Sequence, residues 1–136
     1  MSDFRRVTDD FTTAPQISLA DVAEAARQGF KTVINNRPDG EDPAHPPSAE
    51  MEAAAKAAGL AYHHIPVRGG PTPDQVEQTR ELLNTAEGPI LAFCRSGTRS
   101  ALALGLAKRE QGASADEVHR CLIEAGFDPG PITHLL

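Results

Sequence analysis

One stretch in the last third of the chain places a short polar loop between two apolar runs. The first run, residues 90–93, follows a Gly-Pro pair and is typical of a short buried strand. The second run, residues 101–107, is typical of a helix. Between them, Cys94 begins a C-x4-R loop that ends at Arg99. The stretch therefore predicts a strand, a tight loop and a helix N-terminus in direct succession.

This loop predicts an anion-binding site with a reactive thiol at its centre. The first amides of a helix lack intrahelical partners and lie at the positive end of its dipole, so they can surround negative charge. Gly97 allows the turn to close, and Arg99 supplies a forked, permanently charged donor. Because helix N-termini and cationic neighbours favour the thiolate, we expect Cys94 to be a nucleophile. Cys94 and Arg99 are the predicted catalytic residues, and the predicted substrate contacts in the loop are Arg95, Ser96, Gly97, Thr98 and Ser100.

Two other interpretations of the loop stay open. Cys94 could be a small apolar residue that ends a strand, as buried cysteines often are. The arginines, glycine and hydroxyl residues that follow it favour thiolate chemistry instead. Short cysteine loops also occur in domains that bind anions without converting them, so a non-catalytic binding module is an alternative.

Length and charge limit what the chain can be. Its 136 residues predict one domain, residues 1–136, with a single core. No stretch reaches the ~20 apolar residues that span a bilayer. Residues 1–6 lack a hydrophobic signal core, so a cytoplasmic protein is expected. The net charge of −6 argues against nucleic acid or an anionic membrane as the main partner.

The cysteines argue against a disulfide scaffold and a metal site. Cys94 and Cys121 are the two cysteines of the chain, and no zinc-ligand spacing is present. We therefore expect neither a metal nor another cofactor. Cys121 falls on the apolar side of a predicted helix, where packing is its favoured role. The alternative is a resolving thiol for oxidised Cys94, although nothing in the sequence places the two together.

Helix and strand patterns alternate along the chain. After a weak signal for an edge strand at 7–11, the pattern predicts a helix from Ser18 to about Gly29 and a strand at 30–34. A helix at 48–58, a strand at 61–67 and a helix from the Thr72–Gln75 capping box to about Ala86 follow. The Cys94 strand, loop and helix extend to Gly112, and a helix from Ser114 to Gly126 and a short tail complete the chain. This alternation predicts an α/β fold with a mainly parallel central sheet of four to five strands and helices on both faces.

Two further loops follow predicted strands and should lie at the same edge of the sheet as Cys94. The loop at 35–43 contains Arg37 and Asp39, and the loop at 68–71 contains Arg68. The two arginines are predicted substrate contacts and Asp39 is a candidate general acid, although solvated turns would also use such residues. His63 and His64 are adjacent in a strand, so at most one can face the site.

Three segments together resemble the phosphatase-like domain of the beta-lactamase-hydrolase-like proteins. They are residues 30–41, 64–67 and 93–100, and the resemblance extends over nearly the whole chain. It implies a fold like that of dual-specificity protein tyrosine phosphatases. The family is linked in some bacteria to sulfide and persulfide metabolism, and the loop at 94–99 alone resembles the active-site loop of rhodanese sulfurtransferases.

The sequence departs from the phosphatase pattern in two places. Those phosphatases use C-x5-R, whereas position 100 here is serine, and they carry an aspartate acid where this chain has residues 67–70. Sulfur transfer needs no leaving-group proton, so we rank first a transfer from thiosulfate or a persulfide, through a Cys94 persulfide, to a thiol acceptor. Hydrolysis of a phosphomonoester or phosphotyrosine through a Cys94 phosphocysteine ranks second. Binding of a small anion or a phosphoprotein without catalysis ranks third.

Overall fold

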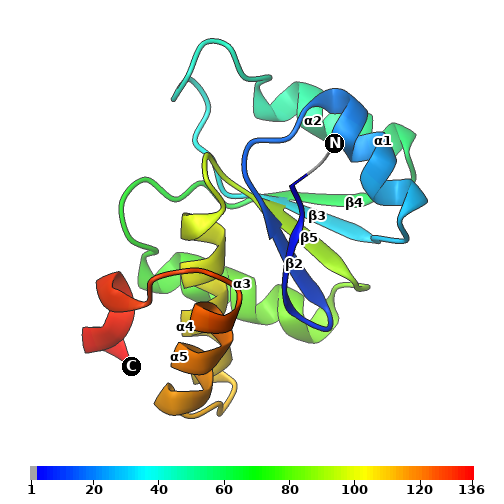
Figure 1. Ribbon diagram of the computed structural model, residues 1–136. Coiled ribbons are helices and arrows are strands. Elements are labelled where there is room, and N and C mark those ends of the chain that lie inside the picture. The colour runs from blue at the N-terminus through cyan, green and yellow to red at the C-terminus, as the bar shows by residue number, and fades with distance from the viewer. Residues whose placement is uncertain (1–2) are drawn as a thin grey trace.

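Strands and helices alternate around a five-stranded sheet in the structure, a computed structural model that describes residues 3–136 (Figure 1). Met1 and Ser2, part of the segment tested for a signal core, lie outside the described residues. The elements are β1 Arg5–Thr8, β2 Phe11–Ala14, α1 Leu19–Arg27, β3 Thr32–Asn35, α2 Ser48–Ala57, β4 Ala61–His64, α3 Pro73–Thr85, β5 Ile90–Phe93, α4 Thr98–Glu110, α5 Ala115–Glu124 and the 3-10 helix η1 Gly130–Leu135.

The sheet has the strand order β1-β2-β5-β3-β4. Only the β1–β2 pair is antiparallel among the strands of residues 3–136, and the other three pairs are parallel. This confirms the predicted α/β class and the mainly parallel sheet. β5 lies between β2 and β3, so the loop that begins at Cys94 leaves the centre of the sheet.

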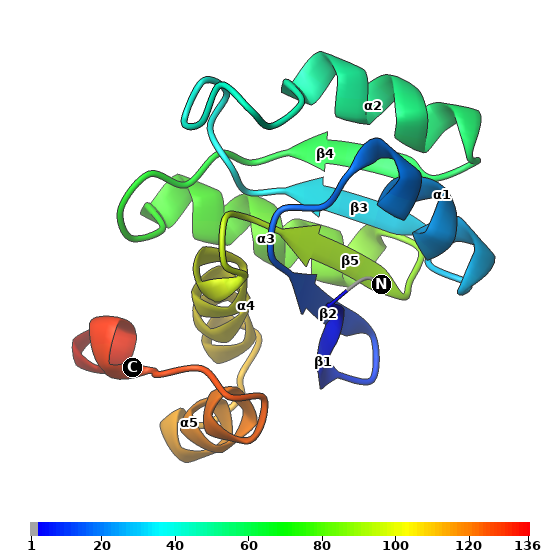
Figure 2. The ribbon, with the colours of Figure 1, turned by 45° about the horizontal axis from the view of Figure 1, so that its top comes forward.

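Helices cover both faces of the sheet, as predicted (Figure 2). Alternate residues of β3 and β5 point to opposite faces. Val33, Leu91 and Phe93 pack with residues of α1 and α2, whereas Ile34 and Ala92 pack with residues of α3 and α4. Each central strand is therefore buried on both sides, which explains why its sequence is a continuous apolar run.

Three helices begin where the sequence predicted, because each has a complete capping box. Ser18, Thr72 and Ser114 each accept a hydrogen bond from the backbone N–H three residues later, and that residue's side chain accepts one in return. A cap of this kind stabilises a protein by about 1 kcal/mol. These starts fix where the preceding loops end.

The two ends of the chain differ from the prediction. The weak strand signal at 7–11 becomes a hairpin, with a turn between β1 and β2, and β2 is buried beside β5. The predicted tail contains η1, whose Ile132 is only 2% exposed. A side chain at Gly105 would lie 3.1 Å from both Leu122 and Val118, so this glycine permits α5 to pack closely on α4. No helix within residues 3–136 combines the length and apolar character needed to cross a membrane.

Candidate active site

The Cys94 loop connects β5 to α4 and surrounds a buried sulfur. Cys94 is fully buried, and its Sγ accepts a hydrogen bond from the Gly97 backbone N–H at 3.1 Å. Gly97 is the N-cap of α4 and has φ of 90°, a left-handed conformation that favours glycine. A Cβ there would also lie 3.4 Å from the Ala14 carbonyl oxygen. The strand, loop and helix N-terminus thus direct an amide and a helix dipole at the thiol, as the spacing predicted.

Arg99 approaches the same sulfur with an edge of its guanidinium that bonds to no oxygen of residues 3–136. Its Nη1 donates to Glu41 Oε2 at 2.8 Å and to the Val67 carbonyl at 2.6 Å, and its Nη2 donates to Glu41 Oε1 at 2.7 Å. A guanidinium has five N–H donors. Within residues 3–136, Nε–H and the second Nη2–H donate to no oxygen, and these two form the side edge of the fork.

Charge links that guanidinium to the thiol. The hydrogen bonds to Glu41 raise the pKa of Arg99, and the Cys94 sulfur acts in the same direction through its charge and a hydrogen bond. Arg99 is therefore held at one edge by a carboxylate, and it interacts with the sulfur of Cys94. This is the arrangement needed to bind an oxyanion that lies against Sγ.

Glu41 is a central residue of the site that the sequence analysis missed. Its carboxylate accepts hydrogen bonds from Arg99 and, at 2.8 Å, from Arg37 Nε. The hydrogen bonds from Arg99 lower the pKa of Glu41 to about 2, with a further contribution from Arg37. The carboxylate is thus ionised at neutral pH and holds two cations. Its position four residues after Arg37, in a loop at a strand's carboxyl end, was the available signal.

Arg37 is connected to the Cys94 sulfur through Glu41 and Arg99. Its side chain is 5% exposed and donates from Nε to Glu41 and from Nη1 to Gln16 Oε1 at 3.1 Å. Its carbonyl accepts a hydrogen bond from His64 Nε2 at 2.8 Å. His63 and His64 both line a depression beside α3. Arg37 positions Glu41, and its own contact with substrate stays a prediction.

Asp39 and Arg68 lie on the two predicted flanking loops. Asp39 Oδ1 accepts a hydrogen bond from the Ser48 backbone N–H at 2.7 Å, so this carboxylate serves the first amide of α2. Arg68 is exposed, and its side chain bonds to none of the residues that the structure describes. The neighbouring Val67 instead contributes to the site, because its carbonyl holds Arg99.

The remaining loop residues differ in exposure. Ser96 Oγ donates to Thr98 Oγ1 at 3.0 Å on the surface of the loop. Ser100 is fully buried in the first turn of α4, and its Oγ has no hydrogen-bond partner within residues 3–136. Arg95 is exposed, and its carbonyl accepts a hydrogen bond from Gln16 N–H at 3.2 Å.

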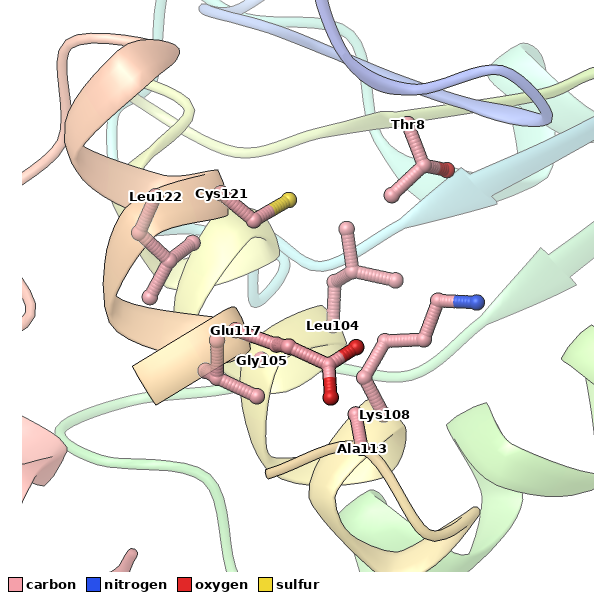
Figure 3. Close-up of a pocket in the computed structure, with 9 residues that line it drawn as sticks. Thr8, Leu104, Gly105, Lys108, Ala113, Glu117, Cys121 and Leu122 are labelled. Carbon is pink, nitrogen blue, oxygen red and sulfur yellow. The ribbon is translucent and has the colours of Figure 1, made fainter. Parts of the chain in front are cut away.

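The second cysteine lies in a different part of the molecule. Cys121 extends from α5 toward a pocket of about 210 Å³ that Leu104, Lys108 and Thr8 also line (Figure 3). Its thiol donates to the Val7 carbonyl at 3.3 Å, and burial raises the pKa of Cys121. Cys94 is not among the residues of this pocket, and both cysteines are free.

A mainly parallel sheet thus places a buried cysteine, a short loop and an arginine at the first turn of the next helix. Residues 3–111 match the family described as "Beta-lactamase hydrolase-like protein, phosphatase-like domain", and the chain belongs to that family. A "Beta-lactamase hydrolase-like protein" of Agrobacterium fabrum is 41% identical over 96 residues, which are 70% of this chain and 22% of that protein. One from Xylella fastidiosa is 39% identical over 107 residues, which are 77% of this chain and 25% of that protein. The chain thus spans about a quarter of the length of these relatives.

Solved structures with the same fold are described as phosphatases. A candidate phosphatase from Neisseria meningitidis is 33% identical and has a TM-score of 0.83, over 96% of this chain and 94% of that chain. The core catalytic domain of the PP-IP phosphatase SIW14 from S. cerevisiae, in complex with citrate, is 18% identical with a TM-score of 0.67, over 97% of this chain and 83% of that chain. These proteins favour phosphatase chemistry over sulfur transfer, which reverses the order predicted from the sequence.

Proposed function

We propose that this domain is a cysteine-dependent phosphatase that hydrolyses phosphomonoesters of small anionic molecules, with phosphotyrosine as one candidate substrate. The observation that supports the proposal is the edge of Arg99 that interacts with the Cys94 sulfur and bonds to no oxygen of residues 3–136, while Glu41 and Val67 hold the other donors. A phosphoryl group over Sγ would accept hydrogen bonds from Arg99 and from the amides of the loop.

The reaction follows from these contacts. The Cys94 thiolate attacks phosphorus, the bond from phosphorus to the ester oxygen breaks, and the leaving group departs as a phenoxide, or as an alcohol that takes its proton from a general acid. Water then attacks the phosphocysteine, the P–S bond breaks, and inorganic phosphate leaves with the thiolate restored. Arg99 and the amides of the loop stabilise charge on the equatorial oxygens in both steps.

The proton for the leaving group has one proposed source. Glu41, with a pKa of about 2, holds no proton to give at neutral pH. Asp39 lies on the same loop, and we propose it as the acid for esters with basic leaving groups. Its Oδ1 accepts the hydrogen bond from Ser48 N–H, so the transferable proton would lie on Oδ2. Aryl phosphates, whose leaving groups are weak bases, need no such donor, so we expect them to be the better substrates.

Turnover of an aryl phosphate by Cys94→Ser and Cys121→Ser tests the proposal. We expect Cys94→Ser to lose at least about 10³-fold in kcat/KM, because the nucleophile is gone. Cys121→Ser should keep full activity, which controls for the loss of a thiol. Equal activity in Cys94→Ser and the unaltered protein would overturn the proposal.

Intact mass distinguishes the chemistry that the sequence ranked first. After incubation with thiosulfate, the phosphatase proposal expects no stable gain of one sulfur at Cys94. A Cys94-dependent gain of one sulfur, together with no turnover of aryl phosphate, would replace the proposal by sulfur transfer to a thiol acceptor.

A further inference from the structure

A polar groove of about 420 Å³ lies beside the Cys94 loop and is separate from the free edge of Arg99. It is bounded by the segment between β2 and α1, by the loop that follows β3, and by Arg95 of the Cys94 loop. The backbone bond from Gln16 N–H to the Arg95 carbonyl joins the groove wall to the loop. A molecule with one end on Cys94 could therefore place its other end here.

Two guanidinium groups line this groove, and both have donors to spare. Arg37 is only 4% exposed, so its positive charge is buried in the wall of the groove. Among the described residues, its Nη2 approaches one carboxylate oxygen, Asp42 Oδ2, at 4.0 Å. The Arg95 side chain is exposed and bonds to none of residues 3–136. Against these two positive charges stand Asp42 in the lining and Glu41, which pairs with Arg37 outside it. The groove suits an anion because its guanidinium groups keep unused N–H donors.

A third group from the loop after β3 lines the same groove. The Nδ1 atom of His45 is buried and has no hydrogen-bond partner within residues 3–136. A buried polar atom without a partner costs free energy, and most buried polar atoms in proteins have a hydrogen-bond partner. Arg37 and Arg95 bring guanidinium donors from two loops to one groove, and His45 adds a buried ring nitrogen that donates in one of its tautomers, which suits an anion with several oxygens.

We propose that this groove is a second anion subsite and that the substrates are small molecules with two phosphate groups. The reacting phosphate lies over Cys94 and Arg99, and the second lies in the groove with Arg95, Arg37 and His45. This inference rests on the proposed function for the role of the first phosphate.

Binding to the Cys94→Ser protein tests the subsite without catalysis. Calorimetry measures the affinity for methylphosphonate, which has one phosphonate group, and for a series of bisphosphonates whose two phosphonate groups are joined by one to four methylene groups. We expect at least one bisphosphonate to bind about 10-fold or more tightly than methylphosphonate, the scale of one or two charge-assisted hydrogen bonds. Phosphonoacetate, whose second anionic group is a carboxylate, should show a smaller gain in affinity over methylphosphonate.

The matched variants assign that gain to the groove. Arg95→Gln, made in the Cys94→Ser protein, should remove most of the bisphosphonate gain, and His45→Phe should reduce it about 3-fold or more. Arg120→Gln removes one positive charge at an exposed position of α5 and should keep the gain in bisphosphonate affinity. Circular dichroism confirms that each variant is folded. A gain that survives both groove variants, or no gain with any bisphosphonate, would overturn the subsite.

The same set separates this inference from the proposed function. Turnover of an aryl phosphate without any bisphosphonate gain removes the subsite and leaves the phosphatase. A bisphosphonate gain that depends on Arg95, in a protein that turns over no phosphate ester, supports the subsite and removes the phosphatase. A phosphonoacetate gain equal to that of the bisphosphonates would overturn the assignment of a second phosphate group.

Discussion

Cys94 and Cys121 are both free thiols, yet their hydrogen bonds run in opposite directions. Cys94 accepts a bond from the Gly97 N–H and interacts with Arg99, whereas Cys121 donates its proton to the Val7 carbonyl. Burial raises the pKa of Cys121, which favours its neutral thiol. The family match, residues 3–111, includes the first cysteine and ends before the second. The two thiols therefore differ in the donors and acceptors around them, and not only in burial.

Among the substitutions that compare the two thiols, the largest expected effect on turnover comes from the cation beside Cys94. Arg99→Lys keeps the charge but loses the fork, so we expect kcat/KM for an aryl phosphate to fall by about 10²–10³. The matched control is Lys108→Met, which removes the cation near Cys121 and should leave turnover unchanged. Equal losses in the two variants would mean that the two cysteine environments are not functionally different.

Alkylation gives a direct comparison of the two sulfurs. We expect sulfate or phosphate to slow the reaction of iodoacetamide with Cys94 by about 10-fold or more, because the anion occupies the Arg99 edge and the loop amides. Burial raises the pKa of Cys121, so its reaction should be slow below pH 9 and insensitive to either anion. Peptide mass mapping measures both sites in one sample, and protection of Cys121 to the same extent would contradict the assigned anion site.

Glu41, which holds Arg99, and Glu117, which lines the pocket beside Cys121, give a further comparison of the two thiols. Glu41→Gln keeps one acceptor but no charge, so Arg99 is held less firmly at its far edge. We expect kcat/KM to fall about 10-fold, mainly through kcat, since the guanidinium must be oriented for the transition state. Glu117→Gln, near Cys121, preserves its capping box and should change nothing. A change confined to KM would show that Glu41 competes with substrate for Arg99 and does not orient it.

The sequence predicted those parts of the molecule whose causes are local. Ser18, Thr72 and Ser114 identify helix starts because a capping box involves residues only three positions apart. The Cys94 loop was predicted with its strand and helix for the same reason. Glu41 was missed because its partner Arg99 is 58 positions away, and nothing near Glu41 indicates that partner.

A strand near the start of the chain was predicted and is present as β1 at the edge of the sheet, but β2 and η1 were missed for a related reason. β2 is a strand because it pairs with β5, about 80 positions along the chain, and the residues of β2 themselves give a weak signal. Ile132 is buried because Gly105 leaves room for close packing of η1 and α5 on α4. Such contacts are determined by tertiary structure, which local periodicity does not encode.

The smallest expected effect concerns stability in acid, and it separates Glu41 from an ordinary surface carboxylate. The pKa of Glu41 is about 2 in the folded protein, against an ordinary value of 4.5. A carboxyl group whose pKa is lowered by folding stabilises the protein above its unfolded pKa, and that contribution is lost as pH falls through the folded value. The contribution of Glu41 is therefore complete above about pH 4.5 and declines toward pH 2.

Urea unfolding of the unaltered protein and Glu41→Gln at pH 7, 4, 3 and 2 measures this contribution. We expect the pH-dependent part of the difference in unfolding free energy to be about 1 kcal/mol, because solvent screens a side chain that is 28% exposed. Glu24→Gln, whose partner Arg27 lies on the exposed surface of α1, is the control and should show less dependence on pH. If the two variants follow the same pH profile, then Glu41 is held by Arg99 no more firmly than Glu24 is held by Arg27. The fixed edge of Arg99, on which both the phosphatase site and its comparison with Cys121 depend, would then have to be abandoned.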